Sequence, residues 1–122
     1  MIVGTGVDLI EIARMEKAMS RSGFAVRVFT EAERAYAAER RDRPEVYAGM
    51  FAAKEAVSKA LGTGIAGFSI RDIEILHNER RAPYAVLHGG AREAFDSLAA
   101  KRVLISISHD QSTAVAFAVI EE

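Results

Sequence analysis

The segment FAAKEAVSKALGTG, residues 51–64, decides the fold that the sequence predicts. Alanine, leucine, lysine and glutamate are strong helix formers and glycine ends helices, so the segment reads as the last turns of a long helix. Helical spacing places four apolar residues on one stripe that packs on a core: Ala53, Val57, Ala60 and Leu61. A second face carries Glu55, Ser58, Lys59 and Gly62.

The second face joins one carboxylate, Glu55, to one ammonium, Lys59, and ends in the glycines Gly62 and Gly64. The simplest interpretation is a surface ion pair one helical turn apart, worth roughly 0.2–0.5 kcal/mol. The alternative is that both charges belong to a functional site. Two other segments of the chain favour that alternative.

The segment resembles the signature helix of the phosphopantetheinyl transferases, most closely that of the short bacterial type, the holo-(acyl carrier protein) synthases. The resemblance rests on KEAVSKALGTG at 54–64, GTGVDLIEIAR at 4–14, and SISHD at 106–110 followed by AVAFA at 114–118. A single Lys-Glu-Ala triplet alone would carry no information about the family. Three segments in the family's order, spread over a chain of the family's length, make the resemblance specific.

The resemblance implies an enzyme that moves the 4′-phosphopantetheine group of coenzyme A onto a serine of apo-acyl carrier protein. It implies release of 3′,5′-ADP and a role in fatty acid biosynthesis. It also implies Mg²⁺ held by Asp8 and Glu55, because this ion takes one or two carboxylates plus phosphates and waters. Taken alone, an aspartate after a strand is more often a cap or turn residue. The residues implied in binding coenzyme A are Lys59, Gly62, Pro83, Ser106 and His109.

The proton acceptor of this reaction stays open. The resemblance implies a catalytic set of Asp8, Glu55, Lys59 and His109. Glu55, a metal-bound water and His109 are the candidate bases, and an unperturbed histidine with a pKa near ~6.5 suits the task. A histidine in this turn equally suits a phosphate contact or solvent exposure. His77 and His88 read as sheet or turn residues.

The sequence departs from the family pattern at two places that carry cations. Met50 stands where the family commonly has arginine, and Arg81 and Ala82 replace the glycine and lysine of its hairpin motif. Nucleotide affinity is therefore the property in which we expect this chain to differ. Arg80 and Arg81 are the candidate replacements for the missing cations.

Composition limits the class of protein. The 122 residues, 50% of them hydrophobic, predict one domain, residues 1–122, with a single core. The absence of cysteine excludes disulfides and thiolate chemistry and suits a reducing cytoplasm. We expect no membrane segment, because no apolar run approaches the ~20 residues of a span and no signal-peptide pattern is present. The net charge of −1 gives no reason to expect nucleic-acid binding.

An acidic partner must therefore meet a local basic patch, and one is predicted on a helix over residues 10–21. Arg14, Lys17 and Arg21 recur on one side of that helix. Most such faces are simply solvated. The functional interpretation is a docking strip for the acidic acyl carrier protein, through charge complementarity. The inward stripe of this helix consists of Ile12, Met15 and Met19.

The remaining elements follow from periodicity and turn residues. Strands are expected at 1–9, 70–76, 84–88, 103–108 and 113–120, and helices at 10–21, 31–40, 44–61 and 91–100. Gly4 and Gly6 in the first strand allow a bulge or a close backbone neighbour. Thr30 to Glu33 is a capping box, and Pro44 suits a first helical turn. The role of the cluster Arg40, Arg41 and Arg43, solvated loop or anion contact, stays open.

Gly89-Gly90 is expected to end the second strand of a hairpin, before a helix whose core residues are Phe95, Leu98 and Ala99. These elements predict an α+β fold with an antiparallel sheet and helices packed against it. In the last strand, Ala114, Ala116 and Ala118 form one face and Val115, Phe117 and Val119 the other. Both faces are apolar, so both are covered, either within one protomer or by another subunit. The resemblance implies a homotrimer with sites at the subunit boundaries.

Two other classes of function compete with the enzyme. A non-catalytic coenzyme A or carrier-protein binding module of the same fold is the main alternative. The joint presence of Asp8, Glu55 and Lys59 favours the enzyme, because a pure binder needs no pair of metal-binding carboxylates. A structural or nucleic-acid-binding domain has no basic excess and no tryptophan to support it.

Overall fold

The computed structural model describes residues 1–62 and 67–122. The Thr63-Gly64 end of the signature segment, and Ala66 of the loop expected after it, lie outside the described residues. The strands are β1 (Ile2–Glu11), β2 (Ile73–His77), β3 (Pro83–Leu87), β4 (Arg102–His109) and β5 (Thr113–Glu121). The helices are α1 (Ile12–Met19), α2 (Phe24–Val28), α3 (Glu31–Ala38), α4 (Pro44–Ala60), α5 (Gly89–Ser97) and a 3₁₀ turn, η1 (Ile70–Asp72).

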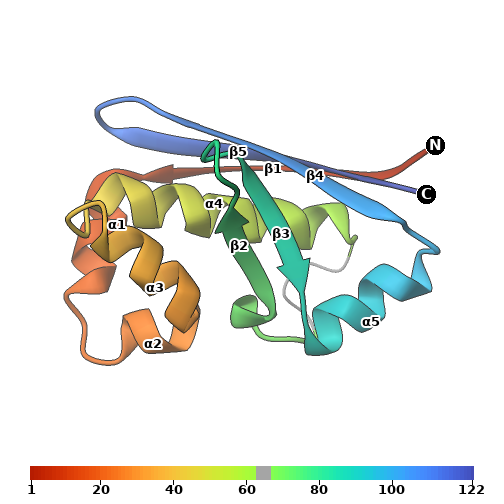
Figure 1. Ribbon diagram of the computed structural model, residues 1–122, viewed down its shortest axis with the longest axis horizontal. Helices are drawn as coiled ribbons and strands as arrows, with labels where there is room; N and C mark the ends of the chain where they lie inside the picture. Colours follow the sequence, from red (N-terminus) through yellow and green to blue (C-terminus); the bar gives the residue numbers. More distant parts are fainter. Residues whose placement is uncertain (63–66) are drawn as a thin grey trace.

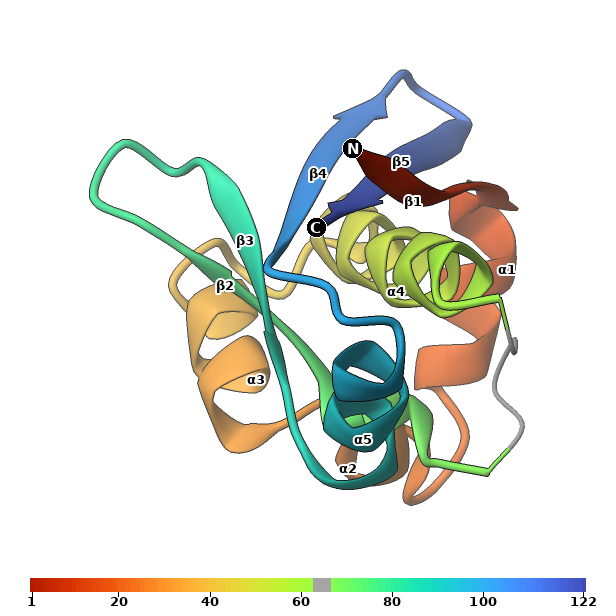
Figure 2. The ribbon, with the colours of Figure 1, turned by 90° about the vertical axis from the view of Figure 1, so that its right-hand side faces the viewer.

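The α+β class and the antiparallel pairing are confirmed, but the strands form two sheets rather than one. One sheet has three strands in the order β1-β5-β4, and the other is the β2-β3 hairpin. Figure 2 shows β3 approaching β4 at one end and splaying away from it at the other, and the two strands do not pair. The alternating pattern specifies which face of a hairpin is apolar, but not whether two hairpins share an edge.

Helix α4 lies along the inner face of the three-stranded sheet and forms the centre of the molecule (Figure 1). The predicted apolar stripe of α4 is confirmed, since Ala53, Val57, Ala60 and Leu61 are all buried. The facing residues of β5 are small and fully buried as well, which lets helix and strand approach closely: Ala114, Ala116 and Ala118. The hairpin and α3 pack around the opposite side of α4.

Several element boundaries differ from the sequence prediction. The first strand continues to Glu11, and α1 begins only at Ile12, because Ile10 and Glu11 still pair with β5. Helix α2 was not predicted at all. Its five residues follow Gly23, which has a left-handed φ of 80°. The capping box at Thr30 and Glu33 is confirmed.

The segment from Ile70 to Asp72 was predicted as strand and is instead the turn η1. The Ser69 hydroxyl accepts the Arg71 N–H, and the Asp72 carboxylate accepts the Ser69 N–H, so side chains satisfy the turn locally. The strand before Gly89-Gly90 ends at Leu87, as predicted, but the two glycines also form the first turn of α5, which was expected to begin at Ala91. That helix ends before Ala99, which has a φ of 54° and is exposed rather than a core residue.

Within residues 1–62 and 67–122, no helix is both long enough and apolar enough to cross a membrane.

Candidate active site

Two glycines allow β1 to lie directly on α4. A Cβ atom at Gly4 would come within 2.0 Å of the Ala60 carbonyl oxygen, and one at Gly6 within 2.0 Å of the Ala56 carbonyl oxygen. No side chain fits in that space, so both positions require glycine. The close backbone neighbour expected from the sequence is thereby confirmed. The next residue on this face of β1 is Asp8, which is held against the C-terminal half of α4.

The Asp8 carboxylate meets a lysine of α4. Lys59 Nζ lies 3.2 Å from Asp8 Oδ1 and donates to the Val7 carbonyl oxygen at 2.9 Å. The Asp8 side chain is only 20% exposed, so the pair is partly shielded from water. Lys59 therefore pairs with Asp8 rather than with Glu55, contrary to the simplest interpretation of the sequence, because β1 brings a second carboxylate to the ammonium.

Glu55 lines the same cleft as Asp8. Burial raises the pKa of the Glu55 carboxyl above its ordinary value, the charge of Asp8 raises it further, and Lys59 opposes both effects. Two carboxylates that repel each other in a partly buried cleft favour a cation between them. Ser58 was predicted to share the face of Glu55, but it is buried and donates to the Glu55 carbonyl oxygen at 2.7 Å.

The chemistry of this cleft fits Mg²⁺. Asp8 and Glu55 supply hard carboxylate oxygens. The ammonium of Lys59 already pairs with the Asp8 carboxylate, which shows that this carboxylate accepts a positive charge. No group of three or more potential metal ligands occurs among the described residues. A pair is nevertheless enough for Mg²⁺, because this ion completes its shell with waters and substrate phosphates.

The cleft beside Asp8 and Glu55 has a volume of about 530 Å³ and lies between α1, α4 and the end of β1. The three cations predicted for docking all line it: Arg14, Lys17 and Arg21. Two aromatic residues that the sequence reasoning did not select also line it, Phe24 and Phe51. Phe51 directly precedes the signature Ala-Ala-Lys-Glu run, and that position was the signal that could have found it. We call this cleft the carboxylate cleft.

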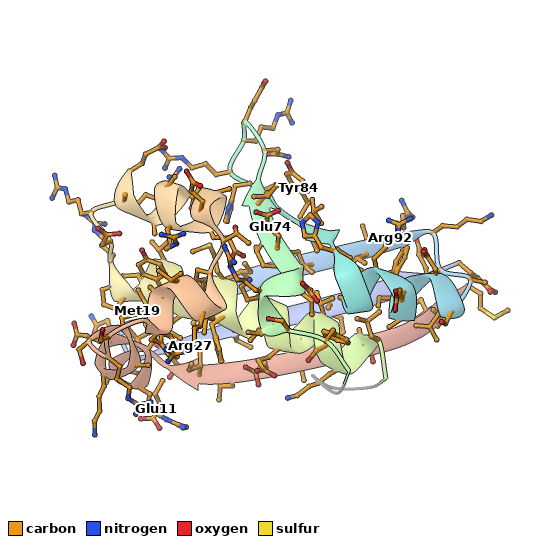
Figure 3. All side chains as sticks on the ribbon, turned by 90° about the horizontal axis from the view of Figure 1, so that it is seen from below. Glu11, Met19, Arg27, Glu74, Tyr84 and Arg92 are labelled. Atoms are coloured by element: carbon orange, nitrogen blue, oxygen red, sulfur yellow. The ribbon has the colours of Figure 1, made fainter. Side chains whose placement is uncertain are left out.

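A second pocket, of about 260 Å³, lies between the β2-β3 hairpin, the start of α4 and the end of β4. His109 and Pro83 line it, as do Met50 and Arg81, the positions where the sequence departs from the family pattern. We call it the hairpin pocket. It shares no lining residue with the carboxylate cleft among the described residues. Figure 3 shows Tyr84 of the hairpin and Glu11, at the end of β1, on opposite sides of the molecule.

An aromatic stack that the sequence reasoning missed forms one wall of the hairpin pocket. The rings of Tyr36 and His77 are parallel, with centroids 3.8 Å apart, and the Arg40 guanidinium lies 3.5 Å from the Tyr36 ring centroid. Burial and the charge of Arg40 lower the pKa of His77 to about 4, so this imidazole is neutral at pH 7. The sequence leaves the role of the arginine cluster open between a solvated loop and an anion contact. In the structure, Arg40 of this cluster packs on the Tyr36 ring.

Two residues of the predicted coenzyme A set line neither pocket. Ser106 faces outward from the three-stranded sheet, opposite Phe117 on β5. Gly62 follows the end of α4 with a φ of 83° and donates its N–H to the Lys59 carbonyl oxygen. The chain thus brings Asp8, Glu55 and Lys59 together and groups Pro83 with His109 elsewhere. Ser106 and Gly62 lie apart from both groups.

Comparison with known proteins identifies the family. Residues 4–118 match the 4′-phosphopantetheinyl transferase superfamily. The chain is 51% identical to the holo-[acyl-carrier-protein] synthase of Clostridium perfringens over 126 residues, covering 99% of this chain and 95% of that relative. The fold matches the crystal structure of a Bacillus anthracis holo-(acyl-carrier-protein) synthase in complex with CoA (3′,5′-ADP), with a TM-score of 0.82 and 40% identity, covering 100% of this chain and 98% of that one.

The Helicobacter pylori holo-[acyl-carrier-protein] synthase in complex with coenzyme A matches with a TM-score of 0.85 and 35% identity, covering 96% of this chain and 99% of that one. These matches extend over nearly the whole chain and agree with the three segments that carry the sequence resemblance. The chain therefore belongs to the 4′-phosphopantetheinyl transferase superfamily.

Proposed function

We propose that this protein transfers the 4′-phosphopantetheine group of coenzyme A to a serine of apo-acyl carrier protein, in a Mg²⁺-dependent reaction that supports fatty acid biosynthesis. The observation that carries the proposal is that Asp8 and Glu55 line one cleft rimmed by cations, while Lys59 pairs with Asp8. The names of the relatives and the coenzyme A complexes of two solved structures support the same reaction. The cysteine-free sequence supports a cytoplasmic location.

The reaction is a phosphoryl transfer. The serine oxygen forms a new P–O bond, a P–O bond of the pyrophosphate breaks, and its electron pair leaves with 3′,5′-ADP. Mg²⁺, held by Asp8 and Glu55, would neutralise the charge of the pyrophosphate when bound. Lys59, which pairs with the Asp8 carboxylate, supplies a second positive charge for a phosphate oxygen. The serine proton goes to a base. The candidate bases are Glu55, in the carboxylate cleft, and His109, in the hairpin pocket.

We infer that Arg14, with Lys17 and Arg21, docks the acidic carrier protein at the rim of the carboxylate cleft. Arg14→Ala is expected to raise the KM for carrier protein about tenfold, since a charge-assisted contact is worth roughly 1.5–3 kcal/mol, and to leave the KM for coenzyme A nearly unchanged. Steady-state kinetics with each substrate varied in turn measures this difference. Added salt should mimic the substitution, because it screens exposed charges. An equal rise in both KM values would refute the docking role.

We infer that the hairpin pocket receives the nucleotide end of coenzyme A. Its polar lining includes Arg81 and His109, and its apolar lining includes Met50 and Pro83. Arg81 has a left-handed φ of 64°, a backbone conformation that favours glycine, and it lines this pocket. Arg81 is therefore the candidate to supply the positive charge that is missing at Met50, where the family commonly has arginine.

We infer that three copies of the chain assemble, and that each active site joins the carboxylate cleft of one copy to the hairpin pocket of the next. The outer face of the three-stranded sheet supports this assembly. Val7 is 51% exposed, Leu9 69%, and Leu104 and Phe117 46% each. An apolar face of this kind on β1, β5 and β4 favours a protein partner over water. A ring of identical copies closes such a heterologous contact.

Mixing two inactive variants tests the composite site. A Glu55→Gln subunit keeps an intact hairpin pocket, and an Arg81→Glu subunit, whose pocket repels a phosphate, keeps an intact carboxylate cleft. After subunit exchange, roughly a quarter of the boundaries carry neither defect, because identical contacts form at random around a closed ring. Transfer activity should return to about that fraction. No recovery in a mixture that has exchanged subunits, or full activity from a protein that light scattering finds monomeric, would refute the composite site.

Mass spectrometry of apo-carrier protein tests the reaction itself. Incubation with this protein, coenzyme A and Mg²⁺ is expected to add the mass of one phosphopantetheine group, and chelation of the metal should prevent the gain. Carrier protein that is bound but unchanged in mass would instead support the second candidate, a non-catalytic binding module. The paired carboxylates favour the enzyme.

A further inference from the structure

Two charged side chains in the core belong to none of the roles described above. Lys54 Nζ lies 2.9 Å from Glu33 Oε1, and both side chains are 0% exposed. Glu33 is the capping-box residue of α3, and Lys54 is the residue of α4 directly before Glu55. A buried ion pair is weak evidence for stability, because removing two charges from water costs about as much as their attraction returns. Its presence in a core of this size calls for a reason other than packing.

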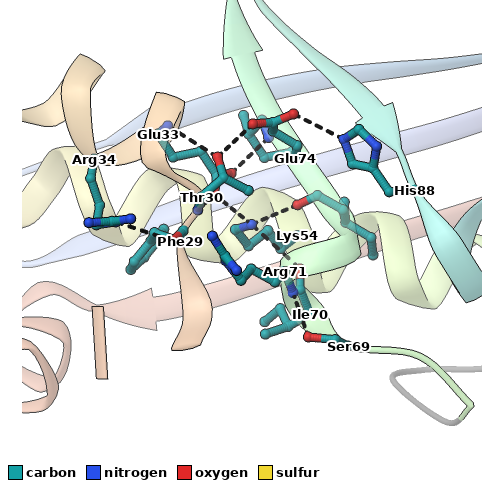
Figure 4. A network of polar contacts seen from close by, with 12 residues as sticks. Phe29, Thr30, Glu33, Arg34, Lys54, Ser69, Ile70, Arg71, Glu74 and His88 are labelled. Carbon is teal, nitrogen blue, oxygen red and sulfur yellow. Dashed lines mark hydrogen bonds and ion pairs between the residues drawn. The ribbon is translucent and has the colours of Figure 1, made fainter. Parts of the chain in front are cut away.

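The pair binds the free edge of the β2-β3 hairpin. Lys54 Nζ donates to the Ile73 carbonyl oxygen at 2.7 Å and to the Ile70 carbonyl oxygen at 3.4 Å. Glu33 Oε2 accepts the N–H of Ile75 at 2.8 Å. Figure 4 shows these contacts converging where α3, α4 and the start of β2 meet. In the described part of the chain β2 pairs only with β3, so Lys54 and Glu33 satisfy the backbone groups that a neighbouring strand would otherwise satisfy.

The contacts to Ile73 and Ile75 also fix where the hairpin pocket lies. His77, which stacks on Tyr36 in the wall of that pocket, is two residues beyond Ile75 on the same strand. Met50, which lines the pocket from α4, precedes Lys54 by about one helical turn. The ion pair therefore stands between the two elements whose separation defines the pocket.

We propose that Lys54 and Glu33 are positioning residues: they hold the β2-β3 hairpin at a fixed place on α4 and so set the shape of the hairpin pocket for coenzyme A. The proposal rests on the proposed function only in assigning the nucleotide to that pocket. Both side chains are fully buried and line neither the hairpin pocket nor the carboxylate cleft, so both act through the hairpin.

The double substitution Glu33→Gln/Lys54→Met tests this role. It removes both charges together, which avoids leaving one buried charge unpaired, and it keeps the volumes similar. A methionine side chain in place of the lysine cannot donate to Ile70 or Ile73, so both carbonyl oxygens lose this donor. The expected result is a KM for coenzyme A about tenfold higher, the effect of losing one or two hydrogen bonds to a charged group. The KM for carrier protein and Mn²⁺ binding at the carboxylate cleft should change far less than the KM for coenzyme A, since neither residue lines that cleft and the Lys54 side chain, although next to Glu55 in the sequence, contacts β2.

Val57→Ala is the matched control for a merely structural effect. Val57 is a fully buried residue of the same helix on the stripe that packs on the core, and it lies outside both pockets. Its truncation lowers stability by leaving a cavity. If Val57→Ala raises the KM for coenzyme A as much as the double variant does at the same loss in Tm, the proposal is overturned.

Amide hydrogen exchange supplies a readout that does not depend on catalysis. The amides of β2 and β3 should exchange faster in the double variant, while those of β1 and β5 keep their wild-type rates. If the double variant changes the exchange rates of all four strands equally, or leaves the KM for coenzyme A unchanged, the proposal is overturned and the proposed function stays intact. Failure of the wild type to modify carrier protein would overturn the function, and the exchange result would still decide the positioning role. If the double variant does not fold, Glu33→Gln/Lys54→Gln, a neutral pair that leaves no buried charge unpaired, should give the same selective changes at smaller size.

Discussion

Glu55→Gln is expected to abolish phosphopantetheinyl transfer while leaving the protein folded. The substitution keeps the size of the side chain and removes the charge that would hold Mg²⁺ together with Asp8. Loss of the cation that would neutralise the transferring phosphate costs a factor of roughly 10³ or more in kcat. The rate of carrier modification at saturating Mg²⁺ measures the loss, and the paramagnetic signal of bound Mn²⁺ reports the metal site separately.

The stability of this variant distinguishes a chemical effect from a folding effect. Folding raises the pKa of Glu55, chiefly through burial, so the ionised carboxylate is disfavoured in the folded protein relative to the unfolded chain. The associated penalty is absent at low pH and fully present once the pH exceeds the raised pKa. At neutral pH and without metal, the Tm of Glu55→Gln should therefore equal or exceed that of wild type.

Glu93→Gln is the control for loss of a carboxylate, because Glu93 is exposed on α5 and lines neither pocket. It should retain full activity. Wild-type activity of Glu55→Gln at saturating Mg²⁺ would remove Glu55 from the metal site and from catalysis together.

Gly6→Ala is expected to destabilise the protein strongly, although it adds only a single methyl group. Its Cβ would lie 2.0 Å from the Ala56 carbonyl oxygen and 2.9 Å from the Ala60 nitrogen, both of them backbone atoms of α4 that cannot rotate away. Strand and helix must separate, which costs about 3 kcal/mol or more, at the upper end of overpacking effects. Chemical denaturation measures the loss in free energy of unfolding.

The same substitution should also reduce transfer activity, because Asp8 lies two residues further along the displaced strand. A shift of about 1 Å in a positioned group is enough to cost roughly 10²-fold in rate. Thr5→Ala, on the exposed face of the same strand, is the control and should change both quantities little. A Gly6→Ala protein as stable and active as wild type would mean that β1 does not need its contact with α4.

The sequence predicted most of the local structure because turn and cap chemistry are local. The capping box at Thr30 and the proline at the start of α4 indicated two helix starts, and both are present. The predictions that were wrong lie where a distant partner decides. Ile10 and Glu11 looked like the start of a helix, and pairing with β5 keeps them in the strand. The alternation at Ile73 to Ile75 predicted a strand correctly, but not that side chains from α3 and α4 would occupy its free edge.

For the candidate site too, local sequence decided some features and distant contacts decided the others. The sequence by itself determined the family and selected Asp8, Glu55 and Lys59 as candidate site residues, because both depend on residue types at fixed spacing. Only the tertiary structure decided that Lys59 pairs with Asp8, that Ser58 is buried, and that His109 and Pro83 lie in a pocket separate from the carboxylates. The physical reason is that a helical face limits which residues share a side, whereas their neighbours depend on how closely another element approaches. Here the two glycines of β1 set that approach.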